Sequence, residues 1–587
     1  MTDQKMESAF EGLSMNEDGD KLVIGVDFGT TYSGVAYLFT GVEKPEPIPI
    51  TEWPGGLNKP KVPTIIRYEK NSPQTFAWGY ELAHTTIEGK IEGIKLLLDP
   101  DQPKPLYVPQ TNTRAELKRL GKPPIDVAAD YISALYKHAL SKIEASWPQD
   151  YLQMLQKKFV LTVPALWSDK ARSITERAAK KAGIFPITLI KEPEAAARYT
   201  LYSLKDKAIS IGDAFVLCDA GGGTVDLISY EVTKIDPLEL RELVKGTGGL
   251  AGSLMINKRF EEAIREAVGE DQYLPLRKHK SYRLAMQYFD ESVKPVFNPF
   301  NQSADDVYYV NFPMAGLADD PANNISSNCF NVTREILEGI YQPLIKDIHG
   351  LVKEQVDSVR IKRMEENHAK GKEIKAIFLV GGFGSSIYLR ESLQGLHPDI
   401  QIIQPTDAWS AIVRGAVLSQ APKEAVVTST VASRHYGVSA TDPWTDDDAG
   451  QPQIWDSIQE HNRVKKMTWY IHAGEDLLRE QKVSFTFYRS VEEDYDRDQL
   501  IFSDKLIQSE AIMAPKYPDS GTTTVNCVLT ADFRGVPKEN FKRCFAKNGR
   551  PYYQVHYSLN ITFDSAMMRF TSEMNGKEMG LVEAKYE

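Results

Sequence analysis

The sequence predicts an α/β domain of about 400 residues, followed by a smaller antiparallel β-domain. Three observations lead to this fold class. From Lys21 to about Gln420, short apolar runs alternate with patterns typical of helices. Within that stretch, an apolar strand that ends in a Gly/Thr-rich turn occurs twice, near Leu22 and near Ala214. Beyond about residue 425, strict alternation of apolar and polar residues replaces the helical periodicity.

The composition narrows the classes of partner. The chain has 587 residues, and 69 Lys and Arg against 80 Asp and Glu leave a formal charge of −11. This balance argues against nucleic acid and anionic membranes as partners, because both require a basic surface. No apolar run approaches the roughly 20 residues of a membrane helix, and the N-terminus has no apolar signal segment. We therefore expect a cytoplasmic or nuclear protein without a membrane span, whose residues 1–20 form a disordered polar tail.

Local patterns place several elements. A helix is predicted after Pro123-Pro124, with Asp126 as its N-cap, because apolar residues recur there at helical spacing. The Lys/Glu-rich stretch 360–375 is interpreted as a solvated helix face. Residues 555–564 alternate without error, which predicts a strand with one buried face. Asn575-Gly576 predicts a tight turn after the run Met568–Met574.

The repeated turn is the most informative pattern in the chain. Residues 22–32 read LVIGVDFGTTY and residues 214–226 read AFVLCDAGGGTVD, so each apolar strand ends in an aspartate before a Gly/Thr turn. These aspartates, Asp27 and Asp219, are 192 positions apart. A third glycine turn, GGFGS at 381–385, follows another apolar run. The repeat predicts two related lobes whose turns face each other.

These residue types suit phosphate binding. Glycines let backbone N–H groups approach phosphate oxygens, and Thr30, Thr31 and Thr224 add hydroxyl donors. An aspartate at each strand end can hold the waters of a Mg²⁺ ion. A plain hairpin turn is the alternative for one such segment, and the repeat argues against it. No GxxxxGK[ST] loop is present, and GTGGLA at 246–251 is only a weak Rossmann-like match.

Five motifs occur in an order that resembles a known family. They are DFGTTYS at 27–33, TVPA at 162–165, EPEAAA at 192–197, DAGGGTVD at 219–226 and LVGG at 379–382. Together they resemble the nucleotide-binding domain of the seventy-kilodalton heat-shock protein chaperones, within the actin and sugar-kinase ATPase superfamily. The chain is similar to the divergent, lidless branch of this family found in fungi and animals.

The resemblance implies the architecture in more detail. A two-lobed, actin-like ATPase with a duplicated ribonuclease-H-like fold would occupy residues 21–420. Lobe I would span about 21–210, and lobe II about 211–420 with returning C-terminal helices. Residues 421–587 would form an antiparallel β-sandwich similar to a degenerate substrate-binding domain.

The resemblance also implies roles for individual residues. Mg²⁺ would be held through water by Asp27 and Asp219. ATP or ADP would be bound by residues of the three turns: Asp27, Gly29, Thr30, Thr31, Tyr32, Gly221, Gly222, Gly223, Gly381, Gly382 and Phe383. Catalysis would involve Lys95, Glu192, Asp219, Thr224 and Asp226, with Lys90 as the alternative to Lys95. Phe383 and Ser385 replace a small polar residue and an adenine-stacking arginine of the family, so base preference stays open.

The function implied is that of a chaperone-type ATPase, with slow Mg²⁺-dependent hydrolysis coupled to lobe closure and to the β-domain. The β-domain would bind an unfolded polypeptide or one specific protein, and a co-chaperone is a further expected partner. Two alternatives stay open. One is a nucleotide-dependent interaction or regulatory protein without general chaperone activity, and the other is a small-molecule kinase of the same superfamily.

Overall fold

A computed structural model describes residues 19–70, 72–82, 85, 88–99, 110–204, 209–301, 303, 306–422, 424–456, 461–518, 521–546 and 549–586. The chain forms two compact units. The first contains residues 1–167, 174–240 and 246–426, and the second contains residues 168–173, 241–245 and 427–587. Of the predicted polar tail, residues 1–18 lie outside the described residues.

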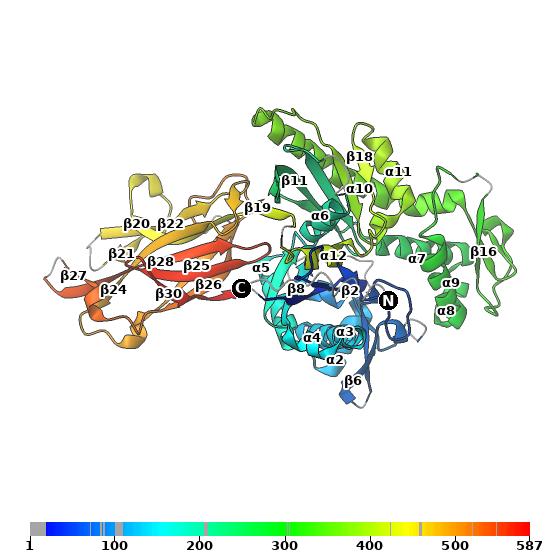
Figure 1. The fold of residues 1–587 in the computed structure, drawn as a ribbon, viewed down its shortest axis with the longest axis horizontal. Coiled ribbons are helices and arrows are strands. Elements are labelled where there is room, and N and C mark those ends of the chain that lie inside the picture. The colour runs from blue at the N-terminus through cyan, green and yellow to red at the C-terminus, as the bar shows by residue number, and fades with distance from the viewer. Residues whose placement is uncertain are drawn as a thin grey trace. The chain divides into compact units, whose positions relative to one another are not determined.

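Two sheets of the same design form the centre of the first unit (Figure 1). In each, an antiparallel hairpin is followed by strands parallel to its first strand. The first sheet has the order β3-β2-β1-β8-β9, with β4 beside β2. Its strands are β1 (Lys21–Asp27), β2 (Tyr32–Phe39), β3 (Ile48–Pro49), β4 (Val62–Pro63), β8 (Gln156–Val163) and β9 (Ile187–Lys191).

The second sheet repeats this arrangement. In the first unit its strands follow the order β18-β17-β10-β11-β12, with β13 beside β11. They are β10 (Ala214–Ala220), β11 (Val225–Ile235), β12 (Leu238–Glu242), β13 (Thr247–Gly249), β17 (Ala376–Val380) and β18 (Gln401–Ile403). The strands β1 and β10 are buried along almost their whole length, as expected for central strands covered on both faces. Two sheets with one topology account for the repeated motif.

Helices and two small sheets complete the first unit. The small sheets are β6-β5-β7 (Ser72–Trp78, Ile65–Glu69, Ile91–Glu92) and β14-β16-β15 (Val307–Asn311, Cys329–Thr333, Ile325–Ser326). The α-helices in the described ranges are α2 (Gln110–Leu120), α3 (Pro124–Ser146), α4 (Gln149–Met154), α5 (Asp169–Lys181), α6 (Glu192–Ser203), α7 (Leu254–Val268), α8 (Glu270–Lys278), α9 (Lys280–Tyr288), α10 (Arg334–Glu365), α11 (Ile387–Leu396) and α12 (Ala411–Leu418). Of α5, residues 169–173 are counted with the second unit.

The start of α3 corrects one prediction. The N-cap is Pro123 rather than Asp126, which lies in the first turn of the helix. Pro124 is the first helical residue, where proline is favoured because its fixed φ suits the helix and its missing N–H would have no partner there. Asp126 still stabilises the helix start through the positive end of the helix dipole.

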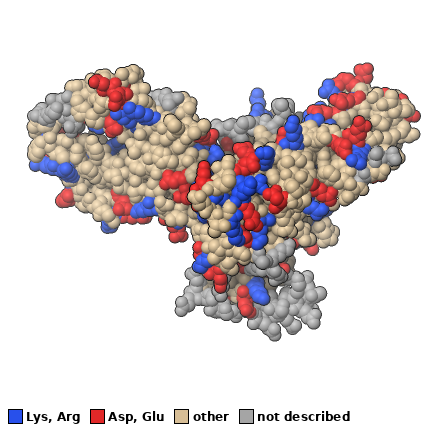
Figure 2. Space-filling model, turned by 90° about the horizontal axis from the view of Figure 1, so that it is seen from above, with Lys and Arg blue, Asp and Glu red and all other residues tan. Residues whose placement is uncertain are grey.

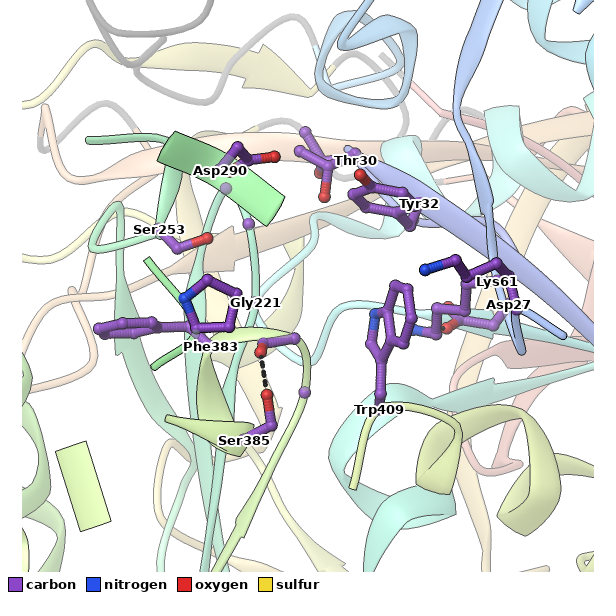
Figure 3. Close-up of a pocket in the computed structure, with 18 of the residues that line it drawn as sticks. Asp27, Thr30, Tyr32, Lys61, Gly221, Ser253, Asp290, Phe383, Ser385 and Trp409 are labelled. Atoms are coloured by element: carbon purple, nitrogen blue, oxygen red, sulfur yellow. Dashed lines mark hydrogen bonds and ion pairs between the residues drawn. The ribbon is translucent and has the colours of Figure 1, made fainter. Parts of the chain in front are cut away.

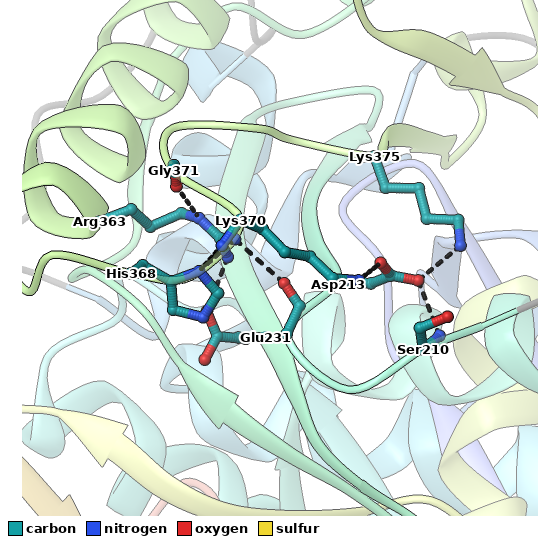
Figure 4. A network of polar contacts seen from close by, with 9 residues as sticks. Ser210, Asp213, Glu231, Arg363, His368, Lys370, Gly371 and Lys375 are labelled. Atoms are coloured by element: carbon teal, nitrogen blue, oxygen red, sulfur yellow. Dashed lines mark hydrogen bonds and ion pairs between the residues drawn. The ribbon is translucent and has the colours of Figure 1, made fainter.

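The end of α10 corrects a second prediction in part, because most of residues 360–375 are exposed or half-buried as expected and Arg363 is not. Arg363, in the stretch interpreted as a solvated face, is fully buried and donates to Glu231 Oε2 at 2.6 Å and to the carbonyl of Gly212 at 3.0 Å (Figure 4). Lys370 and Lys375 each contact Asp213 at 2.5 Å. Charge composition alone cannot distinguish a solvated face from such a network, because the buried carboxylates come from distant strands. This part of the stretch fixes α10 to the β10–β11 hairpin.

The second unit consists of two antiparallel sheets. One has the order β21-β22-β20-β25-β26-β31: Ile454–Asp456, His461–Ile471, His435–Pro443, Ile501–Ser509, Thr523–Asp532 and Glu583–Tyr586. The other has the order β24-β28-β29-β30, with β27 beside β28: Lys482–Glu492, Pro551–Phe563, Met568–Met574, Lys577–Leu581 and Lys542–Phe545. Strand β19 (Val426–Val431) pairs with β23 (Asp476–Leu478).

Side chains from both sheets form one core in the second unit. Leu506 and Leu529 come from the first of these sheets, and Phe485, Leu559 and Ile561 come from the second. The predicted strand at 555–564 lies in β28, and its alternate residues are buried as expected. Asn575 and Gly576 connect β29 to β30 with positive φ angles of 51° and 75°, which favour the mirror-image turns of tight hairpins. The predicted fold class, a mixed α/β part followed by a β-rich part, is confirmed.

Candidate functional site

The three glycine turns of the first unit line one cleft of about 600 Å³, a volume typical of ligand sites. Figure 3 shows Asp27, Tyr32, Lys61 and Trp409 on one side of the cleft. Gly221, Ser253, Phe383 and Ser385 lie on the other side. Every residue of the predicted phosphate and adenosine turns that was named from the sequence lines this cleft: Asp27, Gly29, Thr30, Thr31, Tyr32, Gly221, Gly222, Gly223, Thr224, Gly381, Gly382 and Phe383.

The two Gly/Thr turns approach each other so closely that larger residues would not fit. A Cβ atom on Gly222 would lie 2.4 Å from Thr31 Oγ1, and one on Gly223 would lie 3.2 Å from a Thr30 methyl carbon. The third turn reaches the same point, because a Cβ atom on Gly381 would lie 2.3 Å from Asp219 Oδ1. The N–H group of Gly221 closes its own turn by donating to the carbonyl of Thr224 at 2.9 Å. Glycines at these positions let the backbone of all three turns come close to one bound phosphate group.

Buried carboxylates and lysines lie at the base of the cleft. Asp27 accepts hydrogen bonds from Lys61 Nζ at 2.7 Å and from Thr162 Oγ1 at 3.0 Å. Lys95 Nζ donates to Glu192 Oε1 at 2.5 Å, and Asp226 accepts from Thr224 Oγ1 at 3.0 Å. Asp219 Oδ1 is buried and has no hydrogen-bond partner among the residues that the structure describes. The carboxylates of Asp27, Glu192, Asp219 and Asp226 against the ammonium groups of Lys61 and Lys95 give 4 − 2, a formal excess of two negative charges.

Burial and this excess of negative charge raise the pKa values of three carboxyl groups in the cluster. Burial raises the pKa of Glu192 to about 7, against the attraction of Lys95, and the charges of Asp27 and Asp226 add to the rise. Burial also raises the pKa of Asp219 well above its usual range, and repulsion from Glu192 and Asp226 acts in the same direction. The pKa of Asp226 is raised by burial despite its hydrogen bond from Thr224. The surroundings therefore disfavour full ionisation of this cluster.

The residues present fit a hydrated divalent cation. Among the described residues, no group of three or more His, Cys, Asp or Glu side chains is placed to enclose a metal ion directly. Mg²⁺ needs no such cage, because it keeps several waters and binds proteins through one or two carboxylates together with substrate phosphates. The unpartnered Asp219 Oδ1 and the negative excess around it provide the matching oxygen donor and charge.

Of the two lysines considered from the sequence, Lys95 is the one that lines the cleft. Its side chain is buried, and its Nζ also lies 5.4 Å from the ring centre of Trp167. Lys90 is buried, and burial lowers its pKa, with Glu92 as its nearest opposing charge. Local sequence could not separate the two, because both lie in the short segment before α2.

Three further cleft residues were not predicted from sequence motifs. Lys61 lies between Pro60 and Val62 in no recognisable motif, yet it contacts Asp27 directly. Trp409 follows β18 and packs edge-on against Tyr32, with the ring centres 5.5 Å apart. Asp290 sits in a π-helical turn after α9 and accepts hydrogen bonds from Asn257 and Lys294 at 2.9 Å and 2.8 Å. Each belongs to the site because of tertiary packing.

The adenosine turn differs from a polar, arginine-bearing turn. Phe383 is buried and lies 6.4 Å from the Tyr341 ring, between ring centres. Ser385 donates to the carbonyl of Gly382 at 2.7 Å, which closes the turn (Figure 3). This side of the cleft therefore combines the Phe383 ring with the hydroxyl groups of Ser253 and Ser385, and no arginine that could stack on adenine is among the described lining residues.

Comparisons with known proteins give the family. The family model described as Hsp70 protein matches residues 105–441, more than half of the chain. The chain belongs to the Hsp70 family. This Hsp70-family chain is 24% identical to heat shock 70 kDa protein 12A of Homo sapiens over 472 residues, 68% of this chain and 69% of that protein. It is 23% identical to heat shock 70 kDa protein 12B of Homo sapiens over 492 residues, 71% of each chain.

Other members of the family match a shorter part. Heat shock 70 kDa protein 13 of Mus musculus is 26% identical over 275 residues, 45% of this chain and 54% of that protein. The chaperone protein HscA homolog of Janthinobacterium sp. is 27% identical over 239 residues, 39% of this chain and 35% of that protein. The resemblance stated from the motifs is confirmed, including its divergent character.

Surface charge and helix hydrophobicity are relevant to the nucleic-acid and membrane partners considered from the sequence. On the face that Figure 2 shows, basic and acidic side chains are interspersed, and the coloured residues form no extended surface of one sign. None of the helices in the described ranges is long and apolar enough to cross a membrane.

Proposed function

We propose that this Hsp70-family chain binds ATP with Mg²⁺ in the cleft of its first unit and hydrolyses it slowly. The observation that supports this most is the convergence of three glycine turns on a buried carboxylate cluster that contains an unpartnered oxygen, Asp219 Oδ1. Glycine turns without the cluster would suit many anions. The cluster beside them favours a phosphate ligand that brings a cation.

Each residue of the cluster has a role in this proposal. Backbone N–H groups in the turns 29–32 and 221–223 and the hydroxyl of Thr224 would bind the phosphates. Asp27 and Asp219 would hold Mg²⁺ through its waters, and the bound ion would offset charge on the phosphates. The carboxylates of Glu192 and Asp226 would orient the attacking water. Lys95 would stabilise charge that develops on the γ-phosphate.

Asp219→Asn tests this activity. Wild type should bind ATP in titration calorimetry only when Mg²⁺ is present, and should turn it over in a single-turnover assay. The variant should lose about 10²–10³-fold in hydrolysis rate, the typical cost of removing one preorganised electrostatic contact. Asp347→Asn is the matched control, because Asp347 is an exposed aspartate on α10 of the same unit. Absence of binding and turnover in wild type would reject the proposal.

A regulatory protein that binds nucleotide without turnover is the second candidate. It is favoured by the ion pair of Lys95 and Glu192, because this contact engages both side chains with each other. If the pair persisted with nucleotide bound, Glu192 would not orient water and Lys95 would not reach a phosphate. Tight Mg²⁺-ATP binding without hydrolysis, unchanged by Glu192→Gln, would favour this candidate.

We also propose the division of labour along the chain. Residues 21–420 would form the ATPase, with lobe I at about 21–210 and lobe II at about 211–420, and closure of the lobes would follow binding. The β-rich residues 421–587 would bind an unfolded polypeptide or one protein partner, with a co-chaperone acting on the ATPase. Suppression of aggregation of several unrelated unfolded proteins would support a general chaperone, and selective binding of one protein would support a dedicated partner.

A further inference from the structure

Strand β24 (Lys482–Glu492) is an open edge of the second unit (Figure 1). Among the described residues it pairs with β28 alone, over all eleven of its residues from Lys482↔Thr562 to Glu492↔Tyr552. Every other backbone N–H and C=O group of such a strand points away from its one neighbour. A long edge of this kind is a template for another strand.

The side chains of β24 have two distinct faces. Four residues with odd numbers pack in or against the core: Val483, Phe485, Phe487 and Val491. Phe485 is fully buried, and Phe487 packs on Tyr557 with the ring centres 5.5 Å apart. The fifth, Arg489, is exposed and contacts Asp504 of the facing sheet. The residues with even numbers, from Lys482 to Glu492, are all exposed. Any strand that adds to this edge must keep the same alternation, because a shift by one residue exchanges the faces.

We propose that the occupant of this edge is β24 of a second copy of the chain, in an antiparallel pair centred on Phe487. The strand reads KVSFTFYRSVE, and its two ends match about Phe487, while Phe485 would face Arg489 and Thr486 would face Tyr488. In this register Lys482 would face Glu492, Val483 would face Val491 and Ser484 would face Ser490 of the second copy. Each residue faces one with the same parity, so the core faces of the two copies remain on one side of the joined sheet.

The charges favour this register. Opposite charges directly across an antiparallel pair stabilise it, and like charges destabilise it. The two-fold axis creates the Lys482–Glu492 contact twice, once at each end. A shift that centres the pair on Thr486 would instead place Lys482 opposite Ser490 and would lose both Lys482–Glu492 contacts. Lys482 also contacts Glu573 of its own sheet, and the three donors of an ammonium group allow both contacts.

The resulting dimer would be isologous, with one surface used by both copies. It would join two copies of the β24-β28-β29-β30 sheet edge to edge and would leave no open edge at β24. The proposal depends only on β24 and its neighbours, and it holds whether or not the first unit hydrolyses ATP.

Cross-linking at one register tests the pairing. In a Cys544→Ser background, which removes the one cysteine that is not buried, Ser484→Cys and Ser490→Cys proteins of the full chain carry tags of different size. Directly opposed residues have Cβ atoms about 4.5–5.5 Å apart, close to disulfide geometry. The mixture should give a covalent heterodimer on mild oxidation. Either protein alone should not, because its cysteines would be six residues out of register, about 20 Å apart.

Sedimentation equilibrium provides the second measurement. The fraction of wild-type dimer should rise with concentration, and Glu492→Lys should weaken dimerisation by about tenfold, because two attractive contacts become repulsive. The double variant Lys482→Glu with Glu492→Lys exchanges the charges and should restore it. A folding defect in the single variant would not be repaired by a second surface change.

Three results would overturn the proposal. Wild type could sediment as a monomer at every concentration, as it would if β24 accepted only a segment of a different protein. It could dimerise without forming the mixed cross-link, which would assign the contact to another face. The charge-exchanged variant could dimerise no better than Glu492→Lys, which would reject the register.

Discussion

Asp219 is a carboxylate whose surroundings oppose its own charge. It is buried, it lies beside Glu192 and Asp226, and one of its oxygens has no partner. Such an arrangement lowers the stability of the folded chain and is typical of sites that bind a cation. The folding stability that is lost because of the Asp219 charge can be measured without any ligand.

We expect Asp219→Asn to raise the free energy of unfolding by about 1 kcal/mol at pH 8, within the usual range of single substitutions. Because the pKa of Asp219 is higher in the folded than in the unfolded chain, the associated stability is present at low pH and is lost as the pH rises through the folded-state pKa. Asparagine does not titrate, so the gain should be smaller at pH 5 than at pH 8, and should vanish only below the unfolded-state pKa of about 3.9. Urea unfolding without Mg²⁺ or nucleotide measures both values. An equal gain at both pH values, or a loss at pH 8, would contradict this explanation.

Lys61 is the counterpart of these carboxylates. Its side chain is 7% exposed and its partner Asp27 is 2% exposed, so the pair at 2.7 Å is shielded from water. Lys61→Met should lower the free energy of unfolding by about 3 kcal/mol, because Asp27 would remain as a buried charge without its cation.

Lys142→Met is the matched control for Lys61→Met. Lys142 forms an ion pair with Glu52 at 2.8 Å, with side chains 38% and 58% exposed. Solvent screening makes such a pair worth about 0–1 kcal/mol. In urea unfolding, Lys61→Met should lose more free energy of unfolding than Lys142→Met, because only the Lys61 pair is buried. Equal losses would contradict this role of Lys61.

At the scale of elements, the crossing of α6 and α12 is fixed by one glycine. A Cβ atom on Gly415 of α12 would lie 1.6 Å from the carbonyl oxygen of Ala195 in α6. Helix α6 begins at Glu192, so the position of this catalytic candidate depends on the same contact.

Gly415→Ala should therefore destabilise the chain by about 1–3 kcal/mol, the usual cost of overpacking, and should also slow ATP hydrolysis. Gly350→Ala in the middle of α10 is the control, since nothing lies within 4 Å of the added methyl group. That substitution should stabilise the chain by about 0.5–1 kcal/mol through helix propensity. Thermal unfolding and single-turnover hydrolysis measure both effects, and similar behaviour of the two variants would contradict the role of Gly415.

At the scale of the whole molecule, we expect ligand to stabilise one of the two compact units and not the other. The candidate cleft lies entirely in the first unit. Mg²⁺-ATP at 100 times its dissociation constant should stabilise that unit by about 2.7 kcal/mol, while the second unit stays unchanged. Scanning calorimetry of the full chain should show two transitions, of which one shifts. Equal shifts of both transitions would mean that the units unfold together.

Local sequence predicted the parts of the fold that short segments encode. The Asp-Gly-Thr turns, the alternation in β28 and the Asn575-Gly576 turn all depend on residues close together in the chain. The helix boundary at Pro123 and the burial of Arg363 were missed for the opposite reason. A cap depends on exact backbone geometry, and a buried arginine depends on carboxylates and carbonyls supplied by distant elements.

The sequence by itself determined the family, the repeated turns and the residue types that suit a phosphate, because spacing and composition carry this information. The tertiary structure alone decided which side chains complete the cleft. It brought Lys61 to Asp27, paired Lys95 with Glu192 across 97 positions and placed Trp409 on Tyr32. It also left β24 as an edge, where the two ends of KVSFTFYRSVE would face those of a second copy. Partners so far apart in the chain leave no local pattern, and an edge exists only once the sheet order is set.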